Sequence, residues 1–174
     1  PFRIGPPPGH EKRIAHEVDD VLRECHGLAL AALDAEDLEV ISAHTQDAVV
    51  SATDLAYKRS GRAFVAILNR YDWDSGEGER KRRRTALHFD RVLGVRSRGI
   101  ERGREADVLN LLAIRYVPAG EGPAGMVELV FSGEAAIRLD VECIECRMKD
   151  LGPVWATAKQ PAHDTSDAAP ASRA

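Results

Sequence analysis

The sequence has few cysteines, few aromatic residues and no long apolar run, and each shortage excludes a class of protein. Three cysteines in 174 residues cannot form a disulfide framework, and such a small, odd number is typical of a reducing compartment. Uncharged apolar runs stay well short of the roughly 20 residues that a membrane-spanning helix needs. The segment PFRIGPPPGHEKR contains no apolar stretch of the secretory type. We therefore expect a cytoplasmic protein that does not enter a membrane.

Motifs of the common catalytic classes are also missing. The sequence contains no phosphate-binding loop, dinucleotide-binding glycine motif, nucleophile elbow or zinc-protease motif. Its hydrophobic content of 44% and charged content of 30% are typical of one globular domain. We expect a single domain that is more consistent with a non-enzyme, and we assign it no catalytic residue, metal ligand or cofactor.

Positive charge is abundant in one stretch. Residues 80–104 carry ten Lys or Arg residues against two acidic ones, a formal charge of +8, whereas the rest of the chain carries 14 basic and 26 acidic residues. Clustered guanidinium groups bind phosphate and carboxylate groups well. We therefore predict a surface for an anionic partner, either a nucleic acid or an acidic protein. The predicted surface comprises Arg82, Arg83, Arg84, Arg96 and Arg98.

The same arginines have a simpler explanation, in which they protect an exposed strand edge or pair with acidic residues elsewhere in the chain. No aromatic residue alternates with them, as binding sites for single-stranded nucleic acid usually require. The leading hypothesis is a non-enzymatic binding or adaptor domain with a cationic surface at 80–104, and edge protection stays open beside it.

Apolar periodicity predicts an early helix followed by strands. Asp34 has the side chain of a helix N-cap, and the helix that it starts should end near Gln46. A short strand is expected at 28–33, before the helix. The segment 58–62 has the composition of a hairpin turn. Further strands are expected at 48–57, 63–71, 85–95, 108–117, 125–131 and 135–141.

The apolar period changes from two to helical near Glu142. Val141, Ile144, Met148 and Leu151 recur at helical spacing, and Gly152-Pro153 would end a helix there. The predicted fold class is therefore α+β, with one mostly antiparallel, twisted sheet of about six strands, an early helix and a C-terminal capping helix. Pleckstrin-homology-like rolls share this order of elements.

The flanking segments differ from the predicted α+β domain at 28–156. Residues 1–27 are expected to form a flexible start and an amphipathic helix at 10–26. A third hypothesis is an interaction module that forms a homodimer through this helix or through a sheet edge. Residues 157–174 are polar and rich in Pro and Ala, and we predict that they are disordered.

A second hypothesis is a small metal-dependent enzyme or metal-binding protein. Carboxylates and an imidazole could hold a metal ion or transfer protons. The residues concerned are Asp72, Asp74, His88 and Asp90. Cys143 and Cys146 form a CxxC motif, but zinc needs four ligands, and only Cys25 and His26 could complete the set. Ordinary turn chemistry and a buried structural thiol are the simpler alternatives.

Four blocks of sequence are similar to one family of bacterial proteins. They are LALAALDAEDLEVISAHTQDAVV, LNRYDW, RRRTALHFDRVLGVRSRGI and IRLDVECIECRMKDLGPVW, in this order between Leu28 and Trp155. The chain resembles the bacterial domain-of-unknown-function family 2948. This resemblance implies a small cytoplasmic bacterial protein, transfers no activity or catalytic residue, and places residues 1–27 outside the common core of the family.

Overall fold

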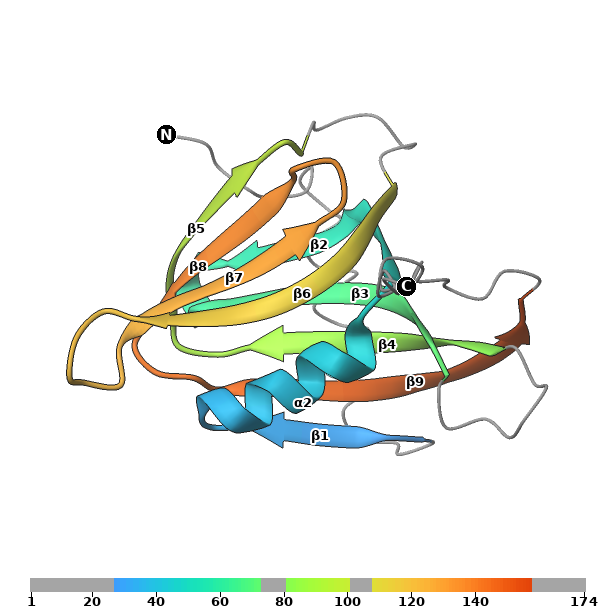
Figure 1. Ribbon diagram of the computed structural model, residues 1–174, viewed down its shortest axis with the longest axis horizontal. Helices are drawn as coiled ribbons and strands as arrows, with labels where there is room; N and C mark the ends of the chain where they lie inside the picture. The colour runs from blue at the N-terminus through green and yellow to red at the C-terminus, as the bar shows by residue number, and fades with distance from the viewer. Residues whose placement is uncertain (1–26, 73–80, 101–107, 158–174) are drawn as a thin grey trace, which may run out of the picture.

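The computed structural model describes residues 27–72, 81–100 and 108–157, which form nine strands, one α-helix and one 3₁₀ turn (Figure 1). In chain order the elements are β1 (Ala29–Ala32), α2 (Ala35–Thr45), β2 (Ala48–Lys58), the 3₁₀ turn η1 (Arg59–Gly61), β3 (Ala63–Tyr71), β4 (Lys81–Phe89), β5 (Val92–Arg98), β6 (Val108–Pro118), β7 (Gly125–Phe131), β8 (Ala136–Val141) and β9 (Cys146–Ala156).

All nine strands belong to one antiparallel sheet, in the order β1-β9-β4-β3-β2-β6-β7-β8-β5. The sheet curls on itself, so that β6, β7 and β8 lie over β3, β4 and β9 (Figure 1). Helix α2 lies along one side of the curled sheet and packs against β6 and β1. The two halves of the sheet therefore enclose one core, and β1 and β5 are its two edges.

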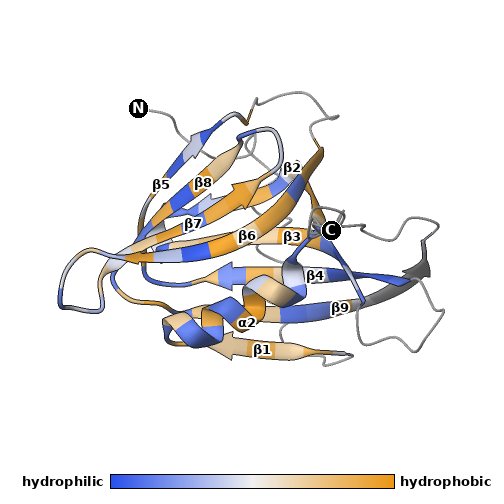
Figure 2. Cartoon of the chain, in the orientation of Figure 1, coloured by the Kyte–Doolittle hydropathy of each residue, from blue (hydrophilic) through white to orange (hydrophobic). Residues whose placement is uncertain are grey.

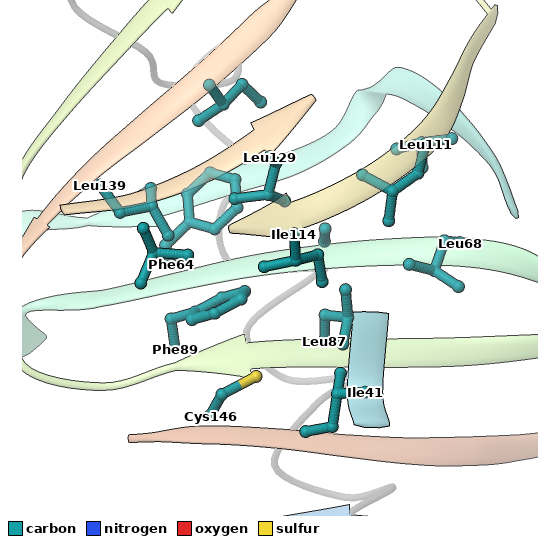
Figure 3. Packing of buried hydrophobic residues seen from close by; sticks show 14 of the residues in the cluster. Ile41, Phe64, Leu68, Leu87, Phe89, Leu111, Ile114, Leu129, Leu139 and Cys146 are labelled. Atoms are coloured by element: carbon teal, nitrogen blue, oxygen red, sulfur yellow. The ribbon is translucent and has the colours of Figure 1, made fainter. Parts of the chain in front are cut away.

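Large apolar side chains fill the space between the two halves. Phe64 and Leu87 project from β3 and β4 toward Leu129 and Leu139 of β7 and β8, and Ile41 of α2 closes one side (Figure 3). Each of these five residues is at most 1% exposed. Hydrophobic and hydrophilic residues alternate along β6 and β8 (Figure 2), as expected for strands with only one face toward the core.

The predicted helix and six of the predicted strands are confirmed. Asp34 caps α2, because its Oδ1 atom accepts a 2.9 Å hydrogen bond from the Asp37 backbone N–H. The helix ends at Thr45, next to the predicted Gln46, and buries Leu38 toward the core. Six predicted strands agree with observed strands to within one residue at each end. These are β1, β2, β3, β6, β7 and β8.

The predicted fold class, α+β with about six strands and a C-terminal helix, is wrong. The described residues form a nine-stranded antiparallel sheet with α2 as its single α-helix. The predicted capping helix is strand β9. Cys146, Met148 and Asp150 all face inward and are at most 2% exposed, so the true period is two. An aspartate at an inward position interrupts the apolar alternation, and the remaining apolar residues then happen to have helical spacing.

The glycine and proline that should have ended the helix lie at a bulge in β9. Gly152 has a φ angle of +89°, which suits glycine. The register between β4 and β9 shifts at this point, from Thr85 opposite Asp150 to Arg83 opposite Val154. Bulges of this kind bend a strand without ending its pairing.

The single strand predicted at 85–95 is in fact two strands, β4 and β5. The chain turns at Asp90 and Arg91, and Arg91 has a left-handed φ angle of +59°. After this turn β5 pairs with β8 and not with β4. Arg91, which interrupts the apolar pattern of the predicted strand, is thus an exposed turn residue, with Nε 3.4 Å from Glu145 Oε2.

Several predictions concern residues that the structure does not describe. The amphipathic helix at 10–26, and all but the first residue of the predicted tail at 157–174, lie outside the described ranges. Within those ranges, no helix is long and apolar enough to cross a membrane.

Candidate anion-binding surface and a buried charge network

The structure separates the five arginines of the predicted cationic surface into two groups. Arg82, Arg83 and Arg84 lie at the start of β4, whereas Arg96 and Arg98 lie near the end of β5. Five strands separate β4 from β5 in the sheet order. The start of β4 and the end of β5 are also far apart in Figure 1. The two groups therefore lie on separate parts of the molecule.

Arg82 makes contacts inside the protein. Its Nη1 atom donates hydrogen bonds to the backbone oxygens of Asn69 at 3.0 Å and Asp47 at 3.4 Å. Burial lowers the pKa of Arg82, and the charges of Asp47 and Tyr71 act in the opposite direction. Since an arginine pKa starts far above neutral, the guanidinium stays charged. Arg82 thus holds the ends of neighbouring strands and is poorly placed to contact a partner.

Next to this group lies a buried charge network that the sequence interpretation missed. Arg70 of β3 and Asp150 of β9 are at most 2% exposed and form a two-point ion pair. Arg70 Nε lies 2.9 Å from Asp150 Oδ1, and Arg70 Nη2 lies 2.8 Å from Oδ2. The Thr85 hydroxyl and the Leu28 backbone N–H also donate to this carboxylate, at 2.8 and 3.1 Å. Strands β3, β4 and β9, and the residue that precedes β1, are therefore linked through one side chain.

Asp72 extends the network to Arg83. Arg83 Nε donates to Asp72 Oδ2 at 2.6 Å, and Asp72 Oδ1 lies 4.0 Å from Arg70 Nη2. Arg70 and Arg83 are directly opposite each other on β3 and β4, a position in which like charges destabilise a sheet. Asp72 and Asp150 supply the two compensating carboxylates. The network is thus balanced in charge, and its geometry is that of a structural network that holds neighbouring strands together.

Asp150 has a lowered pKa for identifiable reasons. Burial alone would raise the pKa of Asp150. Hydrogen bonds from Arg70 and Thr85, the charge of Arg70 and the Leu28 N–H outweigh burial, so the pKa lies below that of an ordinary aspartate. A carboxyl group with a lowered folded-state pKa stabilises the fold above its unfolded-state pKa, near 3.8. That contribution is lost as the pH falls through the folded-state value.

We expect the free energy of unfolding to decline below about pH 4, partly through Asp150. The Asp150→Asn variant cannot titrate at this position, so its free energy of unfolding, although lower at neutral pH, should decline less steeply on acidification. Urea unfolding at several pH values between about 7 and 2.5 measures both slopes. Asp140→Asn removes an exposed carboxylate and is the matched control. Equal acid slopes for Asp150→Asn and the unchanged protein would contradict the prediction.

The second arginine group surrounds a shallow hollow on the outer face of β5 and β8. Its volume is about 170 Å³, and it is lined by Arg96, Ser97, Arg98, Ala136 and Arg138. The register explains the hollow, because Arg96 lies opposite Arg138 and Arg98 lies opposite Ala136. The small Ala136 side chain leaves space between three long ones. Arg138 is a member of this group that the sequence interpretation missed.

These three guanidinium groups are only partly neutralised. The side chains of Arg96 and Arg138 are 67% and 49% exposed, and each has one carboxylate partner. Arg98 donates to the backbone oxygen of Glu134, and among the described residues it has no carboxylate partner. The distances are 2.7 Å from Arg96 Nη2 to Asp140 Oδ1, 2.8 Å from Arg138 Nε to Glu128 Oε1, and 3.2 Å from Arg98 Nε to the Glu134 oxygen. The hollow therefore has a net positive lining.

Another hollow, of about 280 Å³, lies where the β4–β5 turn meets the β8–β9 loop. Each of its three arginines has a carboxylate partner, because Arg91 lies beside Glu145 and Arg147 beside Asp90. The third, Arg62, pairs with Glu142 at the rim of the hollow, so the charges are balanced. The lining residues are Gly61, Arg62, Asp90, Arg91, Glu145 and Arg147. Without an excess of either charge, this hollow offers no preference for an anion.

Of the residues of the metal hypothesis, the structure brings His88 and Asp90 together but not Asp72. His88 Nε2 lies 3.4 Å from Asp90 Oδ1, but Asp72 lies at the other end of β4, where its N–H bonds to Lys81. Lys81 and His88 are seven positions apart on an extended strand, a distance of roughly 23 Å. Asp74 lies outside the described residues. In the part of the chain that the structure describes, no group of three or more potential ligands could hold a metal ion.

The CxxC motif does not form a matched pair of reactive thiols. Cys146 is 1% exposed in the core, near Phe89 (Figure 3), whereas Cys143 is partly exposed in the β8–β9 loop. Burial raises the pKa of the Cys146 thiol, although the charge of Arg147 acts in the opposite direction. A thiol that stays protonated is a poor nucleophile and a poor metal ligand. The structural explanation therefore suits Cys146.

The fold and the arginine-lined hollow define a small antiparallel β domain with a cationic site at one edge of its sheet. The family model described as "Protein of unknown function (DUF2948)" matches residues 28–163, and the chain belongs to this family. The resemblance predicted from the sequence blocks is thereby confirmed. No curated protein and no solved structure matches the chain.

Proposed function

We propose that this protein is a non-enzymatic binding domain of the bacterial cytoplasm whose negatively charged partner binds at the β5–β8 surface. The observation that carries the proposal is the convergence of Arg96, Arg98 and Arg138 on one hollow. Arg96 and Arg138 lie directly opposite each other, an arrangement that costs stability in an isolated sheet. A bound anion would offset this cost, and guanidinium groups bind carboxylate or phosphate through two parallel hydrogen bonds.

The proposal uses only part of the predicted surface. Arg82 and Arg83 make contacts within the protein, so the partner would engage Arg96 and Arg98 together with Arg138. Edge protection alone would require charges on β5. It does not require a third arginine on β8 or the space that Ala136 leaves between them.

The metal-dependent alternative has less support. It needs Asp72 close to His88 and Asp90, and the register of β3 and β4 places Asp72 at the opposite end of the strand pair. Its other version needs a reactive Cys146, whose thiol is buried.

Binding of labelled nucleic acids and labelled polyglutamate, measured by fluorescence anisotropy at two salt concentrations, tests the proposed function. We expect at least one polyanion to bind and to bind more weakly as salt increases, because the contacts are electrostatic. The triple variant Arg96→Ser, Arg98→Ser and Arg138→Ser should weaken this binding by at least about tenfold.

The matched control for this experiment removes three exposed arginines elsewhere, with the same change in net charge. It combines Arg59→Ser, Arg62→Ser and Arg91→Ser. Binding should be nearly unchanged in this control variant. The proposal is refuted if no polyanion binds at low salt, or if the two triple variants lose binding equally.

A further inference from the structure

The arginine-lined hollow lies beside an edge of the sheet. Among the described residues, β5 pairs with β8 on one side and with no strand on the other. The backbone groups of its first residue, Val92, are already hydrogen-bonded. The Val92 N–H donates to the backbone oxygen of Arg62, and the Val92 carbonyl oxygen accepts from the Tyr57 hydroxyl. An edge strand presents alternate N–H and C=O groups that another strand can pair with. The part of β5 that offers such groups therefore runs from Gly94 to Arg98.

A row of charged residues crosses four strands and ends at this edge. Arg115 of β6 lies opposite Glu128 of β7, Glu128 lies opposite Arg138 of β8, and Arg138 lies opposite Arg96 of β5. The charges alternate in sign from β6 to β8, and the positive sign is then repeated on β5. Opposite charges on facing residues stabilise a sheet, and like charges destabilise it. A carboxylate on a further strand, opposite Arg96, would restore the alternation.

Arg98, two residues further along β5, also favours a carboxylate on the added strand. Side chains two residues apart on a strand lie on the same face, so Arg96 and Arg98 point the same way. Arg98 lacks a carboxylate partner among the described residues. Gly94 is the next position on this face, and a side chain there would lie 3.3 Å from Asp140 Oδ2. Acidic residues are therefore favoured opposite Arg96 and Arg98 and disfavoured opposite Gly94.

We infer that the partner is an extended acidic peptide segment that adds to the sheet as a further strand beside β5, with Asp or Glu at two alternate positions opposite Arg96 and Arg98. This inference rests on the proposed function, and it specifies the partner's chemistry and its mode of binding. Backbone hydrogen bonds provide the affinity in such strand addition, and the alternate side chains provide the specificity. The other edge strand, β1, is four residues long with the sequence ALAA and offers no charge for such a partner.

A labelled peptide Ser-Thr-Glu-Val-Glu-Thr-Ser, with blocked ends, tests this inference against the full chain. Two derivatives carry backbone N-methyl groups, one at the odd positions and one at the even positions. Because the N–H groups of a strand point alternately to opposite sides, only one of these derivatives can keep its hydrogen bonds to β5. We expect one derivative to bind like the parent peptide and the other to bind at least about tenfold more weakly.

Two further measurements use the same peptide. Arg96→Ser with Arg98→Ser should weaken its binding by at least about tenfold, and the control pair Arg59→Ser with Arg62→Ser should not. Bound peptide should also slow amide hydrogen exchange within residues 94–98 of β5, because amides that faced solvent become paired. Thermal unfolding of each variant confirms that it is folded before binding is measured.

The outcomes separate this inference from the proposed function. Equal binding of both N-methylated derivatives, or unchanged exchange in β5, would overturn strand addition and leave the anionic surface in place. A nucleic acid that binds through Arg96, Arg98 and Arg138 while the peptide does not bind would also overturn it. If neither the peptide nor any polyanion binds, both proposals fail.

Discussion

Replacing Asp150 with alanine should lower the free energy of unfolding by about 3–5 kcal/mol, a large fraction of the stability of a domain of this size. The substitution leaves the Arg70 guanidinium buried without its two-point partner. The Thr85 hydroxyl and the Leu28 N–H lose their acceptor at the same time. Asp72 offers little compensation, because it is already bonded to Arg83 and lies 4.0 Å from Arg70. Urea unfolding near neutral pH measures the loss.

Asp140→Ala is the matched control for this experiment. Asp140 contacts Arg96 at a similarly short distance of 2.7 Å, but the two side chains are 44% and 67% exposed. Exposed ion pairs contribute at most about 1 kcal/mol, since water screens the attraction. If Asp150→Ala lowers the free energy of unfolding as little as Asp140→Ala does, the buried network does not stabilise the fold as proposed.

The double variant Arg70→Met with Asp150→Leu separates the value of the ion pair from the penalty for breaking it. Replacement of a buried ion pair by apolar residues of similar size is often nearly neutral. The double variant should therefore recover much of the stability that Asp150→Ala loses, although Thr85 and Leu28 still lack an acceptor. A double variant no more stable than Asp150→Ala would mean that the pair itself stabilises the fold.

Only half of the buried charge network could be predicted from the sequence. Arg70 follows Phe64, Ala66 and Leu68 at alternate positions of a correctly predicted strand, so the pattern placed its charge on the inward face. A buried arginine requires a carboxylate, and that requirement could have been recognised. Its partner, Asp150, lies on a strand that periodicity assigned to a helix, so the second half of the pair could not be found.

The hollow illustrates a different limit. Outward positions on β8 were readable, because Ile137 and Leu139 face inward and Arg138 lies between them. Its position opposite Arg96 depends on the turn at Arg91, which sends β5 away from β4 to pair with β8. Local periodicity reports which face a side chain occupies. It does not report which distant strand lies next to it, and the site depends on that pairing.

The two charged regions of the molecule differ in where the carboxylates lie relative to the arginines. Around Arg70 each positive charge has a buried carboxylate beside it, and the carboxylates lie between facing arginines. Around Arg96 two facing arginines have their carboxylates to the side, and the space between them is open to solvent. The first arrangement is complete without a partner. Among the described residues, the second lacks a negative charge on the side of β5 where a further strand could pair, which is why the binding proposals are placed there.

Phe89→Ala should have an effect comparable to that of Asp150→Ala, about 3–5 kcal/mol of unfolding free energy, but through packing. Phe89 is 1% exposed at the end of β4, and its ring centroid lies 6.4 Å from that of Phe64. Phe64 and Cys146 are its neighbours on the two adjoining strands. A chain with 5% aromatic residues has few side chains large enough to fill this position. Alanine would leave a cavity that the surrounding strands cannot close, because their pairing with β4 holds them in place.

Leu93→Ala is the control for Phe89→Ala, because Leu93 is also apolar but is 50% exposed on β5. Its removal should change the free energy of unfolding by no more than about 0.5 kcal/mol. Similar losses for the two variants would contradict the burial assigned to Phe89. The Phe89→Ala variant should also bind the anionic probe normally at temperatures where it is folded, because its cavity lies inside the sheet and the arginines lie on the outer face. Phe89→Ala therefore separates the effect of the core on stability from the effect of the arginines on binding, since it lowers the free energy of unfolding and leaves the residues that are proposed to bind unchanged.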